Sequence, residues 1–245
     1  MATAQRVLEI FEAFATLQKP LTLSQLSDAV GAPVSSCFSI VKTLEEQGYL
    51  HCVSSRKEWY PTGRMAANAR AIEKGEPLLL RFEPVLAALR KKTNETIILG
   101  QASSAGTAIL YLKVFEGGQA IRYTSEVGAR KPLHSTAIGK AVLSTLPPDQ
   151  RRRIADSLKY ERITDRTMGG ERDLLQDVEE GIARGYQMTR GENVVDVGAI
   201  AMPIRLHGRT FGVAIAGPVT RLQDRLEEHV EALRGACAEL EAMAV

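Results

Sequence analysis

The strongest constraint on the fold lies near the amino terminus, where three helical segments precede two strands joined by a basic turn. Apolar residues recur at helical spacing in 4–17 and again in 34–47, and a shorter helix is expected at 24–30. Strand-like residues at 49–53 and 58–61 flank the polar turn. Three helices followed by such a hairpin predict a winged helix-turn-helix domain.

The third helix and the turn supply the residues that would meet DNA. Four apolar residues of this helix share one face and point inward, which leaves a hydroxyl-rich face outward; they are Cys37, Ile40, Val41 and Leu44. A helix fits the major groove, and a basic hairpin reaches phosphate or the minor groove. We therefore expect double-stranded DNA as a partner. The residues predicted to contact it are Ser35, Ser36, Ser39, Lys42, Arg56 and Lys57.

The same unit also has a plainer interpretation, as a small folding module whose serines are helix caps and solvated surface. Residues 1–75 carry eight Lys and Arg against seven Asp and Glu, a net charge of +1. A single copy would therefore gain little from releasing counterions on DNA. Two copies in a dimer would gain more, so the charge favours an oligomer.

The rest of the chain alternates between strands and helices. We expect a linker helix at 64–77 and a second domain at 78–245 after the winged domain at 1–63. Strands are predicted at 96–102, 107–115, 120–125, 186–190, 197–206 and 210–216, with a tight hairpin turn at 207–209. Helices are predicted at 136–145, 148–157, 171–184 and 223–243. The predicted fold class is α+β, with a mostly antiparallel sheet in the second, α/β domain.

The sequence lacks the motifs of the common enzyme classes. It has no Gly-x-Ser-x-Gly elbow, no Gly-rich phosphate loop and no dinucleotide fingerprint. Four histidines lie far apart, and three cysteines show no metal-ligand spacing. We therefore expect no catalytic residues, no cofactor and no metal. A small-molecule enzyme or a protein-interaction module on the same fold stays as the alternative.

Composition places the chain among ordinary water-soluble proteins. Hydrophobic residues make up 44% and charged residues 24%. No apolar run approaches the roughly 20 residues that a membrane span needs, and the first residues lack the apolar core of a signal peptide. We expect a cytoplasmic protein without a membrane partner.

Several motifs, in order along the chain, resemble the IclR family of bacterial regulators. The amino-terminal ones are Leu-Ser-Gln-Leu-Ser at 23–27, Thr-Leu-Glu-Glu-Gln-Gly-Tyr-Leu at 43–50 and Tyr-Pro-Thr-Gly at 60–63. The more specific one runs from Val127 to Ala141 and contains Pro-Leu-His-Ser-Thr-Ala-Ile-Gly-Lys. Gly-Glu-Asn at 191–193, Ala-Ile-Ala-Met-Pro at 199–203 and Ala-Gly-Pro at 216–218 complete the set.

This resemblance implies a winged helix joined to a GAF-like domain that senses small, often acidic or aromatic, metabolites. It also implies binding to operator DNA as a homodimer or homotetramer. The chain departs from the pattern in one respect, because many members have an Arg on the recognition helix near the position of Ser39. This departure concerns the base contacts that the resemblance implies and not the winged helix-turn-helix module itself.

The segment that enters the 136–145 helix is the candidate effector site. Ser135 or Thr136 would cap the helix, and the N–H groups at its start favour an anion. From the residues alone, Ser135 is better read as a cap and His134 as a packing residue; the resemblance reverses that preference. Glu192 and Asn193 face either a ligand or their own loop backbone. The predicted effector-binding residues are His134, Ser135, Thr136, Ala137, Ile138, Thr189, Glu192, Asn193, Ala199, Ala214 and Ala216.

The resemblance also bears on the chemistry of the effector. Members that bind small acids carry Asp, Cys, Ser and Ser at positions that match, approximately, Thr189, Ala199, Ala214 and Ala216 of this chain. Three alanines make a wider and less polar pocket. We therefore expect an aromatic or medium-sized apolar acid as effector.

Overall fold

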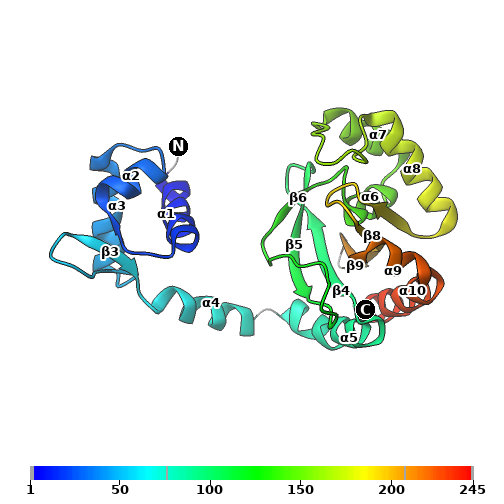
Figure 1. The fold of residues 1–245 in the computed structure, drawn as a ribbon, viewed down its shortest axis with the longest axis horizontal. Coiled ribbons are helices and arrows are strands. Elements are labelled where there is room, and N and C mark those ends of the chain that lie inside the picture. Colours follow the sequence, from blue (N-terminus) through cyan, green and yellow to red (C-terminus); the bar gives the residue numbers. More distant parts are fainter. Residues whose placement is uncertain (1–2, 76, 207, 244–245) are drawn as a thin grey trace. The chain divides into compact units, whose positions relative to one another are not determined.

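The computed structural model describes residues 3–75, 77–206 and 208–243. The chain divides into two compact units, Met1–Pro77 and Leu78–Val245, which Figure 1 shows as ribbons. Each unit has its own buried core.

The first unit has a core of three helices closed by a small antiparallel sheet. Buried apolar residues of all three helices, among them Ile10, Leu26 and Val41, pack with Leu50 and Trp59 of the sheet. The strand order is β1-β3-β2. Its elements are α1 (Thr3–Leu17), β1 (Leu21–Thr22), α2 (Leu23–Ala29), α3 (Val34–Glu46), β2 (Leu50–Cys52), β3 (Glu58–Pro61) and the following helix α4 (Arg64–Lys74).

The strand β1 is a feature that the sequence does not reveal. It has two residues, Leu21 and Thr22, which pair with Trp59 and Glu58 of β3. Two residues are too few to show the alternation that identifies a strand. Thr22 also caps α2 in a capping box with Gln25, so the same residue ends the strand and begins the helix.

The second unit is built on a six-stranded antiparallel sheet with the order β6-β5-β4-β9-β8-β7. The first three strands along the chain lie at one side of the sheet, and the last three at the other. Strands β4 and β9, far apart in sequence, are the central neighbours. The strands are β4 (Thr96–Ala102), β5 (Ala108–Phe115), β6 (Arg130–Pro132), β7 (Gln187–Arg190), β8 (Val197–Leu206) and β9 (Arg209–Pro218).

Helices cover both faces of this sheet. On one face α5 (Pro77–Thr93) and α10 (Leu226–Ala242) share an apolar core with the strands, with Leu86, Val213 and Leu233 at its centre. On the other face α6 (Ala137–Ser144) lies directly against the strands, with α7 (Pro148–Ser157) and α8 (Glu171–Arg184) outside it. Figure 1 shows this second layer around α6.

One predicted strand is wrong. The segment 120–125 is not a strand, and the edge of the sheet is formed instead by β6, which pairs with β5. The carbonyl of Tyr123, in the predicted strand, accepts the hydroxyl of Thr96 rather than a backbone N–H. The closing helix predicted at 223–243 corresponds to α10. A short helix that was not predicted, α9 (Val219–Asp224), precedes it, and Arg225 between the two has a backbone outside the helical region. His207 of the predicted 207–209 turn lies outside the described residues.

Candidate functional site

The outward face of α3 carries the first group of predicted residues. Ser35, Ser39 and Lys42 are exposed, and Ser36 is half-buried. The hydroxyl of Ser39 donates to the carbonyl of Ser35 at 3.3 Å, so its oxygen stays available as an acceptor. Lys42 lies 3.8 Å from Glu46 in an exposed pair one turn away, which contributes little stability.

Two exposed apolar residues of α3 lie beside this face. Val34 and Phe38 are 48% and 51% exposed, one helical turn apart. They were not predicted from the sequence. Val34 has the spacing of the buried stripe, three residues before Cys37 and seven before Val41, so spacing alone does not predict that it is exposed.

The wing is the turn between β2 and β3. Arg56 and Lys57 are exposed at its tip, and Lys57 takes a positive φ of 55°. The backbone N–H of Arg56 donates to Ser54, whose hydroxyl donates to Glu58 at 2.8 Å. The turn is therefore held by its own side chains, with both basic groups directed to solvent.

A pocket lies in the second unit between the start of α6 and the sheet. It encloses about 400 Å³ of space not filled by protein atoms, part of it open to solvent. It holds every predicted effector residue except His134 and Glu192. The lining residues are Ile98, Tyr111, Tyr123, Ser135, Thr136, Ala137, Ile138, Thr189, Asn193, Val194, Val197, Ala199, Ala214 and Ala216.

Strand register explains why small side chains meet on the pocket floor. Thr189, Ala199 and Ala216 are direct neighbours across β7, β8 and β9. Ala214 and Ile98 are direct neighbours across β9 and β4. Residues paired in register point to the same face of a sheet. The floor is therefore a nearly continuous apolar surface with one hydroxyl, that of Thr189.

The start of α6 forms the polar end of the pocket. Thr136 is its N-cap and accepts the N–H of Gly139 at 3.1 Å. The N–H groups of the first two helical residues, Ala137 and Ile138, make no hydrogen bond with any residue that the structure describes. Ser135 is not the cap, and its Oγ accepts the side-chain amide of Asn193 at 2.9 Å. The proton of Ser135 is thus left to donate.

Two tyrosines that the sequence analysis missed form another wall. Burial raises the pKa of Tyr111, and a hydrogen bond with Tyr123 raises it further. The phenol of Tyr111 is therefore neutral at physiological pH. None of the described residues that line the pocket carries a charge.

His134 and Glu192 lie outside the pocket lining. The ring of His134 packs on Tyr160 with centroids 5.2 Å apart, and its Nε2 donates to the carbonyl of Glu161 at 3.3 Å. Burial lowers the pKa of His134, so the ring is neutral. In this arrangement His134 packs the segment before α6, as the plainer reading of the sequence had it.

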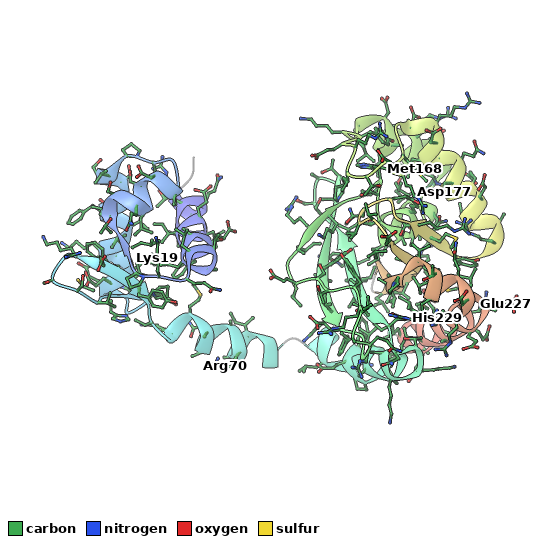
Figure 2. All side chains as sticks on the ribbon, viewed as in Figure 1. Lys19, Arg70, Met168, Asp177, Glu227 and His229 are labelled. Carbon is green, nitrogen blue, oxygen red and sulfur yellow. The ribbon has the colours of Figure 1, made fainter. Side chains whose placement is uncertain are left out.

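Glu192 pairs instead with Lys140, a buried residue of α6 that the sequence analysis missed. Lys140 is 0% exposed. Its Nζ lies 2.6 Å from a carboxylate oxygen of Glu192 and 2.8 Å from one of Asp177 in α8. Figure 2 labels Asp177. Burial raises the pKa of Glu192, and Lys140 opposes that rise. The available signal was a single Lys within the otherwise apolar stretch from Ala137 to Leu143.

The described residues show neither a metal site nor a membrane span. Across the described parts of the chain, no group of three or more His, Cys, Asp or Glu side chains could hold a metal ion. Within the same residues, no helix is both long and apolar enough to cross a bilayer.

Family models match almost the whole chain. The model of the bacterial transcriptional regulator IclR C-terminal domain matches residues 72–242, and the model of the IclR helix-turn-helix domain matches residues 3–52. The chain belongs to the IclR family of bacterial transcriptional regulators. This confirms the predicted family, and with it a transcription regulator rather than an enzyme.

Individual IclR-family proteins agree with the assignment. The transcriptional regulator BhcR of Paracoccus denitrificans is 30% identical over 238 residues, which cover 96% of this chain and 84% of BhcR. The regulator KdgR of Escherichia coli is 28% identical and covers 96% of this chain and 91% of KdgR.

Solved structures share the fold. The IclR structure from Thermotoga maritima superposes with a TM-score of 0.80 at 22% identity, over 99% of this chain and 98% of that one. An IclR homolog from Microbacterium hydrocarbonoxydans, complexed with 4-hydroxybenzoate, has a TM-score of 0.79 at 21% identity over 98% of both chains. These likenesses confirm the predicted winged domain and antiparallel α/β domain.

Proposed function

We propose that this IclR-family regulator binds operator DNA through α3 and the wing, and that a small organic acid bound at the start of α6 changes its DNA affinity. The observation that carries the proposal is the pocket itself. It combines unpaired N–H groups at one end with an uncharged, largely apolar floor.

The polar end of the pocket suits a carboxylate. The N–H groups of Ala137 and Ile138 and the hydroxyl of Ser135 converge as donors. A helix start favours an anion through these donors and through the helix dipole. Because the described lining has no cation, affinity must come from these hydrogen bonds and from burial of the rest of the ligand.

The floor of the pocket would contact the part of the ligand beyond its carboxylate. Ala199, Ala214 and Ala216 present small apolar side chains on which a ring or an alkyl chain would lie, and each buried methylene contributes about 0.8 kcal/mol. We therefore propose an aromatic or medium-sized apolar acid. The 4-hydroxybenzoate bound by the Microbacterium homolog is an acid of this kind and is a suitable first probe.

DNA recognition by α3 would use apolar contacts more than usual. The side chains that read G or A by paired hydrogen bonds are Arg, Lys, Asn and Gln, and the helix from Val34 to Glu46 contains only one of them, Lys42. Phe38 and Val34 would instead contact thymine methyl groups. Lys42, Arg56 and Lys57 would contact phosphate, while Ser35, Ser36 and Ser39 let the backbone approach the groove.

An oligomer fits this mode of binding. Met65 and Ile72, 37% and 74% exposed, lie two turns apart on one side of α4. Such an apolar stripe suits pairing with a second copy, and two winged domains suit a two-fold symmetric operator. We propose a homodimer or homotetramer acting in the cytoplasm.

The test uses DNA selected from a random library by the full-length protein. Fluorescence anisotropy measures its dissociation constant with and without 4-hydroxybenzoate and a series of other monocarboxylates. We expect at least one acid to shift the dissociation constant, and the double variant Lys42→Ala, Arg56→Ala to bind all sequences weakly. Lys19→Ala, which removes an exposed charge elsewhere in the unit, is the control. Unchanged DNA affinity in the double variant would contradict the DNA-binding assignment.

A further inference from the structure

A buried ion network lies beside the pocket and joins three parts of the second unit. Lys140 extends from α6, Asp177 from α8, and Glu192 from the loop 191–196 between β7 and β8. We propose that Lys140 and Glu192 are positioning residues for the effector, which hold this loop against the start of α6. The proposal rests on the proposed function only for the nature of the ligand.

Lys140 is engaged with other groups of the protein rather than with the pocket. Its ammonium donates to the carboxylate of Glu192 at 2.6 Å and to the carbonyl of Met188 at 3.0 Å, and it forms an ion pair with Asp177 at 2.8 Å. Two of the three ammonium protons are thus held in hydrogen bonds. Lys140 does not line the pocket, so its effect on a ligand there is indirect.

The backbone of α6 links Lys140 to the polar end of the pocket. The N–H of Lys140 donates to the carbonyl of Thr136 at 3.1 Å, one turn earlier and at the helix start. The hydrogen bond between Lys140 and Glu192 therefore sets the distance between the start of α6 and the loop.

On the loop side, Glu192 directly precedes the residues that contact the pocket. Asn193 donates to Ser135, and Val194 lines the wall. The loop has positive φ at both ends, 84° at Gly191 and 63° at Asp196. From the outside, the hydroxyls of Thr164 and Thr167 donate to the carbonyls of Gly191 and Glu192 at 2.6 and 2.7 Å. The loop is therefore held from both sides, and Lys140 supplies the contact from α6.

The cost of burying these charges supports a role other than stability. A buried ion pair often adds less stability than well-packed apolar residues of the same volume would. Apolar side chains would fill the space but would not fix the loop at one distance from α6. The directed hydrogen bond of Lys140 to Glu192 does so, and the bond to the carbonyl of Met188 holds the same ammonium against β7.

The first measurement is hydrogen–deuterium exchange of the full chain without ligand, followed in peptides that contain residues 191–197. We expect faster exchange in Lys140→Met and in Glu192→Ala, and near-normal exchange in Glu192→Gln, which keeps an acceptor for the ammonium. Asp177→Asn is the matched control, because it changes a partner of the same ammonium that is not part of the loop. Wild-type exchange in Glu192→Ala would overturn the proposal, even if Lys140→Met does not fold.

The second measurement is calorimetric titration of the same variants with 4-hydroxybenzoate and octanoate. Where the wild type binds either acid, Lys140→Met and Glu192→Ala should weaken binding about tenfold, the equivalent of one charged hydrogen bond. Glu192→Gln and Asp177→Asn should bind nearly as the wild type does. Equal loss in Asp177→Asn would overturn a positioning role in favour of a purely structural one. A wild type that binds neither acid would count against the proposed effector class, while the exchange data still decide the role of Lys140.

Discussion

The side-chain amide of Asn193 donates to the hydroxyl of Ser135 over 2.9 Å. This contact joins the loop after β7 to the residue before the α6 cap, and it directs the hydroxyl proton of Ser135 away from Asn193. The proposed carboxylate site therefore depends on two segments that are remote in sequence.

Ser135→Ala should weaken acid binding about tenfold, because one donor to a charged group is lost. Calorimetric titration of the full chain with 4-hydroxybenzoate measures this. Ser144→Ala, at the far end of α6, is the control, since its hydroxyl donates to the carbonyl of Ala141 within the helix. Equal losses in the two variants would show that the helix, and not the donor, matters.

Ala137→Pro tests the backbone donors at the helix start. Ala137 is the first residue of α6, where proline is tolerated, and Thr136 before it has an extended backbone with φ −119° and ψ 141° that proline permits. The variant removes one N–H and should weaken every carboxylate to a similar degree. Ala137→Val adds comparable volume and keeps the N–H, so it should retain more affinity than the proline variant. If both bind acids equally, the N–H of Ala137 is not a ligand donor.

Ala199→Leu tests the floor of the pocket. The larger side chain fills space over β8, so aromatic and medium-chain acids should lose affinity while acetate and pyruvate do not. Ala199→Gly keeps the space and serves as the control. Thermal shift over an acid series gives a rapid measurement, since a ligand at 100 times its Kd adds about 2.7 kcal/mol of stability. A uniform loss for all acids would point to a distorted sheet rather than a filled pocket.

The sequence predicts most of this architecture because its long elements carry clear periodicity. The predicted helices at 148–157 and 171–184 and the strand at 197–206 agree with the structure. The segment 120–125 misled the prediction because its strand-like residues are held by a side-chain contact with Thr96. Lys140 and Phe38 were missed for a related reason. Whether a Lys is buried, or a Phe exposed, depends on residues far away in the chain.

Phosphate contacts and the proposed contact of Phe38 with a thymine methyl group can be distinguished by two measurements. One is the salt dependence of DNA binding, and the other is the loss of affinity when the methyl group is removed. Lys42→Ala and Arg56→Ala should each reduce the slope of log K against log salt by about 1 per copy, with a similar loss on every sequence. Phe38→Ala should leave that slope unchanged and lower affinity for the selected DNA only. Replacing the contacted thymine with deoxyuracil, which lacks the methyl group, should cost affinity in the wild type and little in Phe38→Ala. Additive losses from the two changes would rule out the methyl contact.

The oligomer is expected to depend on α4. Light scattering of the full chain at micromolar concentration should give at least twice the mass of one chain. Ile72→Glu places a charge in the proposed apolar stripe and should lower that mass. Arg70→Glu, on the opposite side of the helix, should not. A monomeric wild type, with operator DNA absent and present, would contradict the assembly.

The most direct test of the account is a calorimetric comparison of acids of increasing size on the wild-type chain. The small apolar floor and the uncharged lining predict that Kd falls about fourfold for each added methylene until the pocket is full. 4-Hydroxybenzoate and the medium-chain acids should then bind more tightly than acetate, glyoxylate or pyruvate. Tighter binding of one of these two- or three-carbon acids than of every larger acid would contradict the proposed effector class.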